Sequence, residues 1–203
     1  MKLNTRGVTL LSCYLLLSAV SGAQESNEVS PATTNPNLVK NGSFENTKTT
    51  WMDTSCNYME LAAGASTIPH WTVTAATTGK IVWAMTPTCD GYTAASGTYF
   101  LDLTGFGSNA PNGGVQQTLA NLSVGSTYVF AMDVYVQGSL PLVTVNNAPV
   151  SLTAGKPIKK GSTTWTPMQG TFTALSTTPV LVIENQQTGQ AIDFIDNVTV
   201  RLQ

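Results

Sequence analysis

The clearest structural signal in the chain is the stretch STYVFAMDVYV at residues 126–136. Apolar side chains, among them Phe130 and Met132, occupy every second position. This alternation is typical of a β-strand with one buried face. Asp133 and Tyr135 lie on the opposite face. The stretch therefore predicts a long strand and a fold built on β-sheet.

Short extended runs lie on both sides of this strand, separated by Gly, Pro, Asn and Ser. No segment shows the 3.6-residue periodicity of an amphipathic helix. Many short strands with turn residues between them predict an all-β sandwich or barrel. We expect the further strands at residues 38–44, 71–74, 80–83, 99–103, 114–119, 142–145, 169–174, 180–184 and 194–202.

Residues 1–23 have the three parts of a secretory signal peptide. Lys2 and Arg6 come first, an apolar run follows at residues 8–20, and the small residues 21–23 end it. The run is shorter than the about 20 apolar residues that a membrane-spanning helix needs. We therefore expect a secreted protein with no membrane span after cleavage.

The remaining chain divides into a leader and a domain. Residues 24–37 hold two prolines and no periodic apolar residues, which predicts a flexible leader. Residues 38–203 have the length of a single domain.

The mature chain is poor in positive charge. Loss of residues 1–23 removes Lys2 and Arg6 and leaves seven basic against eleven acidic residues, a net charge of −4. A nucleic-acid backbone requires concentrated Lys and Arg to displace its counterions. The composition therefore excludes a nucleic-acid partner.

The cysteine count predicts one disulfide. Cys13 leaves with the signal peptide, so Cys56 and Cys89 remain as a single pair. An even count in an exported chain favours a disulfide, and two independent buried thiols are the alternative. With His70 as the only histidine, the chain lacks the ligands for a zinc site.

An ordered series of motifs resembles a known family. The motifs are NLVKNGSFE at 37–45, IPHWTV at 68–73, YFLDLTG at 99–105, GVQQTL at 114–119 and FIDNVTV at 194–200. This series is similar to the bacterial choice-of-anchor C proteins and to the related plant cell-wall domain of unknown function 642. The resemblance covers nearly the whole chain from Asn37 to Leu202.

The resemblance implies an all-β jelly-roll sandwich of the galactose-binding-like superfamily. It also implies secretion and binding to a cell-wall or extracellular polysaccharide. Two features depart from the family pattern. His70 stands where the family commonly has Gly, so the turn before Trp71 is expected to differ. No apolar anchor precedes the final Gln203, which predicts release rather than surface retention.

The last predicted strand contains a candidate metal ligand. Alternation places Asp196 on the same apolar face as Phe194 and Val198, and an unpaired buried carboxylate is costly. Galactose-binding-like modules often carry a structural Ca²⁺ beside the first and last strands. The resemblance thus implies a calcium site made by Glu45, Asp196 and backbone carbonyls near Asn41. The alternative is a carboxylate that accepts backbone N–H bonds at a strand end.

Sugar sites combine an aromatic platform with amide and carboxylate groups that bind hydroxyls. We predict such a groove from Trp83, Gln117, Asp133 and Tyr135, provided that the Asp133 face of the long strand is open. The alternative for Trp83 and Tyr135 is packing in the core or at its rim.

The sequence contains no recognisable catalytic set. His70 follows Pro69 in a predicted turn, and no Gly-x-Ser-x-Gly motif occurs. We therefore expect a non-enzymatic, secreted carbohydrate-binding domain. The alternative is a structural or adhesion protein of the envelope or extracellular matrix that acts through protein partners.

Overall fold

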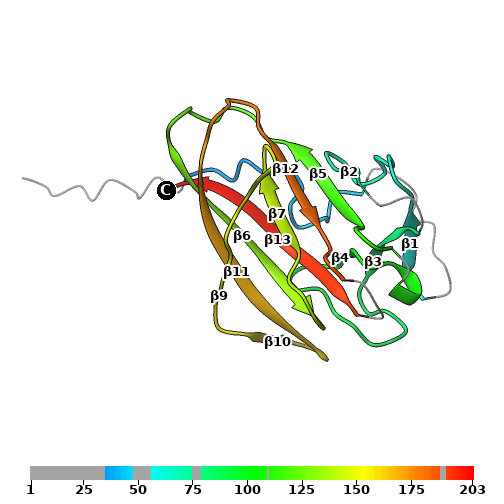
Figure 1. Cartoon of the computed structure of the whole chain (residues 1–203). Coiled ribbons are helices and arrows are strands. Elements are labelled where there is room, and N and C mark those ends of the chain that lie inside the picture. The colour runs from blue at the N-terminus through cyan, green and yellow to red at the C-terminus, as the bar shows by residue number, and fades with distance from the viewer. Residues whose placement is uncertain (1–34, 48–55, 75–78, 109, 188–190) are drawn as a thin grey trace, which may run out of the picture. The chain divides into compact units, whose positions relative to one another are not determined.

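The computed structural model describes residues 35–47, 56–74, 79–108, 110–187 and 191–203. Residues Asn35–Gln203 form one compact unit of two antiparallel β-sheets, drawn in Figure 1. The predicted signal peptide and most of the predicted leader lie outside the described residues. Within these ranges, no helix is long and apolar enough to cross a membrane.

The larger sheet has eight strands. In spatial order they are β1 (Tyr58–Leu61), β3 (Ile81–Met85), β4 (Tyr99–Asp102), β13 (Asp193–Leu202), β6 (Thr127–Val136), β11 (Thr163–Thr173) and β10 (Ile158–Lys160), and β9 (Thr153–Ala154) also pairs with β11. The three long strands β13, β6 and β11 run alongside one another through the middle of this sheet (Figure 1).

The smaller sheet has five strands, in the order β2 (Thr72–Val73), β5 (Gly114–Thr118), β12 (Val180–Glu184), β7 (Leu142–Val145) and β8 (Ala148–Pro149). A 3₁₀ turn, η1 (Phe106–Ser108), follows β4. The structure is thus an all-β jelly-roll sandwich, and the predicted fold class is confirmed.

The main core lies between the two sheets. Even-numbered residues of β6 face it, as the alternation of residues 126–136 predicts, and Phe130 is fully buried there. The opposite sheet contributes Val115, Leu181 and Ile183 to the same core. Trp71 is also buried, and its indole nitrogen donates a hydrogen bond to the carbonyl of Asn41 at 2.9 Å.

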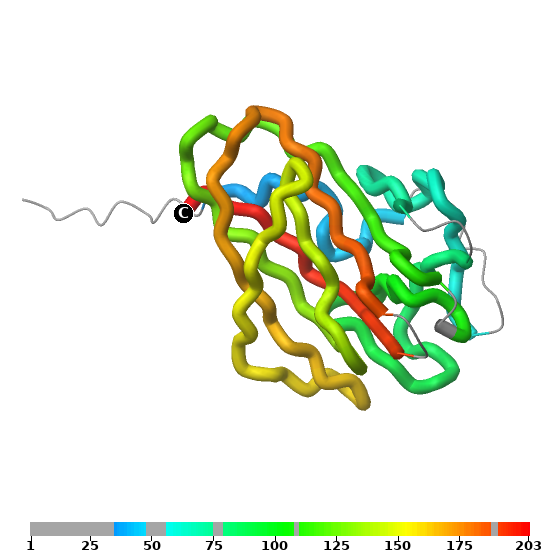
Figure 2. Tube along the Cα trace, in the orientation of Figure 1, coloured from blue at the N-terminus to red at the C-terminus, as the bar shows by residue number. Residues whose placement is uncertain are grey.

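The predicted first strand at residues 38–44 is wrong. This segment forms consecutive turns in which Asn41 and Phe44 have φ values of 51° and 60°. It still runs beside the end of β13, as the Cα trace in Figure 2 shows, because Leu38 donates to the carbonyl of Val200. Left-handed backbone at two positions prevents regular pairing of this segment.

A second cluster of large side chains covers the outer face of the larger sheet. We call it the outer aromatic cluster; its buried aromatic members are Tyr58, Phe100, Trp165 and Phe194, with Tyr92 and Tyr135 packed against them. The segment after β3 lies over this face, since Trp165 donates from its indole nitrogen to the carbonyl of Thr93 at 2.9 Å. Both faces of the larger sheet are therefore packed along part of its length.

A β-bulge divides β13 into two halves. Asp196 pairs with Asp133 and Thr199 pairs with Ala131, so two residues of β13 stand opposite the single residue Met132 of β6. An extra residue reverses the side-chain alternation beyond it. For this reason Phe194 belongs to the outer aromatic cluster rather than sharing a face with Val198, and that part of the sequence prediction is wrong.

Candidate functional site

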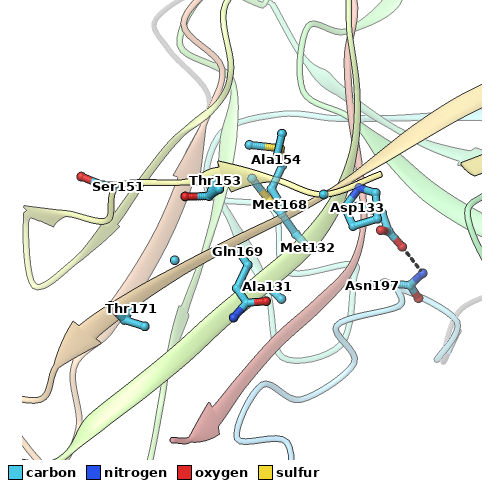
Figure 3. A pocket seen from close by; sticks show the side chains of 13 residues that line it. Ala131, Met132, Asp133, Ser151, Thr153, Ala154, Met168, Gln169, Thr171 and Asn197 are labelled. Atoms are coloured by element: carbon cyan, nitrogen blue, oxygen red, sulfur yellow. Dashed lines mark hydrogen bonds between the residues drawn. The ribbon is translucent and has the colours of Figure 1, made fainter. Parts of the chain in front are cut away.

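A groove of about 540 Å³ lies on the outer face of the larger sheet. Strands β6 and β11 form its floor, and the segment 151–155 beside β11 forms one wall. Figure 3 shows Ala131 and Gln169 at the centre of the floor, with Thr153 beside them. The strand register explains this arrangement, because Gln169 pairs with Ala131 on one side and with Thr153 on the other. We call this feature the β6–β11 groove.

The carboxylate of Asp133 lies at one end of the groove (Figure 3). The amide nitrogen of Asn197 donates to Oδ2 of Asp133 at 2.7 Å, drawn as a dashed line in Figure 3. Asn197 occupies the β13 bulge with a φ of 53°, and this position brings its amide to the outer face. The hydrogen bond orients the Asp133 carboxylate and uses one of its two oxygens.

The groove's central amide is available for a ligand. Gln169 is exposed, and its side chain has no hydrogen-bond partner within the described chain. An amide offers two N–H donors and one carbonyl acceptor. Hydroxyl-bearing Ser151, Thr153 and Thr171 stand around it. The lining holds one acidic side chain, no basic one and no aromatic ring.

The predicted sugar-binding residues do not come together. Asp133 lines the β6–β11 groove, whereas Tyr135, two residues further along β6, packs in the outer aromatic cluster. Its ring stacks on Phe194 with centroids 5.3 Å apart. Of the two alternatives for Tyr135, the structure shows rim packing.

Trp83 and Gln117 lie elsewhere. Trp83 is fully buried in the main core and contacts the ring of Tyr99 at 5.4 Å, so it cannot present a face to a ligand. Gln117 lies on β5 of the smaller sheet, where its amide group both accepts from and donates to the backbone of Lys40, at 2.8 and 2.9 Å. The prediction that these two residues line the Asp133 groove is wrong.

The structure brings Glu45 and Asp196 to the same loop. Oε1 of Glu45 accepts backbone hydrogen bonds from Thr98 and Tyr99 at 2.9 and 2.7 Å. Oδ2 of Asp196 accepts one from Ser96 at 3.0 Å. The two carboxylates therefore hold the segment Ser96–Tyr99 between them, which is the hydrogen-bonded alternative that the sequence left open.

These carboxylates also fit a cation. Burial, together with the negative charges of Glu45 and Asp133, raises the pKa of Asp196 to about 7, against the lowering effect of backbone hydrogen bonds from Ser96 and Asn197. A divalent cation would relieve this repulsion. Oε2 of Glu45 lies beside Gly97 of the same loop and has no hydrogen-bond partner among the described residues. Within the described ranges, no group of three or more His, Cys, Asp or Glu side chains surrounds a common point, so backbone and hydroxyl oxygens would have to complete the shell.

Asn41 does not belong to this pair. Its carbonyl already accepts hydrogen bonds from Phe44 at 3.1 Å and from the indole of Trp71 at 2.9 Å. Its side chain donates to the carbonyl of Pro69 at 3.1 Å. These bonds engage both the carbonyl and the side chain of Asn41, and a contribution of backbone carbonyls near Asn41 to a metal site stays a prediction.

The predicted disulfide is confirmed. Cys56 and Cys89 are joined, with their Cα atoms 4.8 Å apart. The bond connects the start of β1 to the segment that covers the outer face of the larger sheet.

The turn before Trp71 places His70 in left-handed backbone conformation. His70 is exposed and has a φ of 73°, the left-handed region that favours Gly. Since Trp71 remains buried and hydrogen-bonded to Asn41, the turn accommodates histidine without displacing the core.

The fold and groove together define an all-β sandwich with a polar surface groove on its larger sheet. The chain belongs to the family described as "Protein of unknown function (DUF642)", whose model matches residues 37–201. The finer resemblance to choice-of-anchor C proteins stays a prediction. No curated protein matches the chain.

Several solved structures resemble the chain. A "Family 16 Carbohydrate Binding Module-2" is 19% identical, with a TM-score of 0.42 over 81% of this chain and 99% of that one. "TmCBM61 in complex with beta-1,4-galactotriose" is 11% identical, with a TM-score of 0.41 over 83% and 99%. The CBM22-1 xylan-binding domain from Paenibacillus barcinonensis Xyn10C is 15% identical, with a TM-score of 0.38 over 74% and 97%.

Proposed function

We propose that this protein is a secreted, non-catalytic domain that binds a polysaccharide in the β6–β11 groove. The observation that carries this proposal is the amide of Gln169, which has no hydrogen-bond partner among the described residues and lies at the centre of a groove of about 540 Å³. This volume is within the range of about 300–1,000 Å³ typical of ligand sites. The surrounding hydroxyls and the oriented Asp133 carboxylate are groups that hydrogen-bond sugar hydroxyls.

The composition of the groove narrows the ligand class. With no basic side chain, the lining has nothing to neutralise a phosphate, a sulfate or a uronate. With one carboxylate, it repels such anions. A neutral glycan is the ligand class that these groups match.

The test is retention on insoluble neutral polysaccharides. Gln169→Ala and Asp133→Asn are expected to weaken retention about tenfold, since loss of one or two hydrogen bonds costs on the order of 1–2 kcal/mol. Gln186→Ala is the matched control, because Gln186 is an exposed glutamine outside the groove. Depletion of the four proteins from solution by the insoluble polysaccharide, measured as binding isotherms, would give the effect.

Two outcomes would count against the proposal. One is the absence of retention across a broad panel of neutral glycans. The other is equal retention of the Gln169→Ala and wild-type proteins. Co-purification of a protein partner that free sugars do not displace would favour the adhesion alternative.

We further propose that Glu45 and Asp196 hold a structural Ca²⁺ with oxygens of the segment Ser96–Tyr99. Millimolar Ca²⁺ is expected to raise the melting temperature by about 5 °C relative to chelator, because ligand at 100 times its Kd stabilises by about 2.7 kcal/mol. Glu45→Gln should abolish this shift. Glu60→Gln, which alters an exposed carboxylate paired with Lys80 at 3.2 Å, should keep it. Differential scanning calorimetry of the three proteins, each with Ca²⁺ and with chelator, measures these shifts. Equal melting curves of the wild type with Ca²⁺ and with chelator would refute the site.

A further inference from the structure

A second cavity, of about 180 Å³, lies on the outer face of the larger sheet near β1, β3 and β4. Its aromatic lining consists of Tyr58, Tyr92, Phe106 and Phe194, and its acidic lining consists of Asp90 and Asp102. We call it the aromatic cup. It shares no lining residue with the β6–β11 groove.

The four aromatic rings that line the cup form two edge-to-face pairs. Tyr92 and Phe194 meet edge to face with centroids 4.9 Å apart and an interplanar angle of 81°. Tyr58 and Phe106 form a second edge-to-face pair at 6.1 Å and 63°. Phe106 is 57% exposed, unusual for a phenylalanine in a packed domain, and it stands at the mouth of the cavity.

Two carboxylates complete the cup. Tyr58 donates from its hydroxyl to Oδ2 of Asp90 at 3.0 Å. Oδ1 of Asp102 accepts hydrogen bonds from the backbone of Thr104 and Gly105, at 2.9 and 3.2 Å, and Oδ2 has no hydrogen-bond partner within the described chain. Asp102 thus has one oxygen held by the β4–η1 turn and one left for a ligand.

The cup is lined by two carboxyl groups. Burial raises the pKa of Asp102 to about 7, against the lowering effect of its hydrogen bonds from Thr104 and Gly105, so a bound cation would favour its ionised form. No basic side chain lines the cup, and the nearby Lys80 pairs with Glu60 at 3.2 Å. Burial, the hydrogen bond to Asp90, and the charges of Asp90 and Asp102 raise the pKa of Tyr58 to about 12. Aromatic faces attract cations within about 6 Å of the ring centroid, and carboxylates add to that attraction.

We infer that the aromatic cup binds an organic ammonium group, such as the amine of an amino sugar or a quaternary ammonium headgroup. A volume of about 180 Å³ is the space of about six water molecules at roughly 30 Å³ each, enough for one headgroup or one sugar ring. The aromatic rings and the acidic side chains favour a positively charged ligand, and the size of the cavity limits its shape. This inference does not depend on the β6–β11 groove.

The test uses pairs of probes that differ in charge. Choline and its carbon isostere 3,3-dimethyl-1-butanol form one pair, and glucosamine and glucose form the other. Titration calorimetry on the wild-type protein is expected to show at least tenfold tighter binding of one or both cations than of the neutral counterpart. The pair that shows the difference identifies the source of the ammonium group.

Two variants test whether the cation binds in the aromatic cup. Phe106→Ala should weaken cation binding about tenfold with an unchanged melting temperature, because the ring is largely exposed. Asp102→Asn should weaken it similarly. Leu175→Ala, which removes a 76% exposed side chain outside the cup, is the matched control and should bind like wild type.

Three results would overturn the inference. They are equal binding of the cationic and neutral probes, no binding of either cation, and cation binding that Phe106→Ala leaves unchanged. The polysaccharide assay on the Gln169→Ala protein is independent of all three, so failure of the cup and failure of the groove can be told apart.

Discussion

Replacing both Cys56 and Cys89 by serine is expected to lower the free energy of unfolding by roughly 4 kcal/mol. The disulfide closes a loop with a sequence separation of 33 residues, and the chain-entropy model assigns about this value to a loop of that length. The loop includes β1, β2 and β3, so its unfolded form gains much conformational freedom when the bond is lost.

Urea denaturation of the wild-type and double-serine proteins measures this difference. Reductant should lower the urea midpoint of the wild-type protein to nearly that of the double-serine protein. It should leave the midpoint of the double-serine protein unchanged. Equal midpoints for the two proteins under oxidising conditions would contradict the prediction.

Asp193→Asn is expected to make the protein more stable at pH 8, by on the order of 3 kcal/mol or more, with little effect at pH 4. Asp193 is fully buried, and neither carboxylate oxygen has a hydrogen bond of standard geometry within the described chain, although the side chain of Gln187 is near enough to lower the pKa of Asp193 in part. Burial, together with the charge of Asp102, raises its pKa to about 8. Deprotonation therefore leaves an unpaired charge inside the sandwich.

Proton linkage gives the direction in which the free energy of unfolding changes with pH. An unfolded aspartate has a pKa of about 3.9, so between about pH 4 and pH 8 the folded protein retains a proton that the unfolded chain releases. The contribution of Asp193 to stability is fully present below about pH 4 and is lost as the pH rises through about 8. Asparagine carries no titrating proton and avoids this loss.

Denaturant titrations of both proteins at pH 4, 6 and 8 measure the difference at each pH. Asp90→Asn is the matched control, since it makes the same change at an exposed position. A difference between the Asp193→Asn and wild-type proteins that does not change with pH would show that Asp193 is ionised in the folded state.

Local periodicity was sufficient to predict most of the sandwich. Residues 126–136 alternate without interruption, and β6 pairs over that length with its even-numbered side chains in the core. The run 180–184 likewise matches β12. Residues 38–44 begin with Leu38 and Val39 and end with Phe44. The left-handed conformation at Asn41 and Phe44 prevents a strand there.

The β13 bulge explains why the sequence predicts the wrong face of the sheet for Asp196. Uniform alternation from Val198 places Asp196 on the core face. The extra residue in the bulge instead turns Asp196 to the outer face and Asp193 to the core. A bulge is set by pairing with a neighbouring strand, so a single sequence gives little sign of it.

The residues of the β6–β11 groove were only partly predictable, because strand pairing also decides which of them are neighbours. Asp133 is identified by its position on the polar face of residues 126–136. Gln169, Thr153 and Asn197 join it because β9, β11 and β13 come together from distant parts of the chain. Only the pairing register reveals these neighbours.

Ala131 gives the groove its depth. It faces outward from β6, while the adjacent Phe130 and Met132 fill the core. Because the two sets alternate along one strand, a change at position 131 would resize the binding surface and leave the packed interior intact. If the groove binds a glycan as proposed, a substitution at position 131 would change which ligands fit without requiring a new interior.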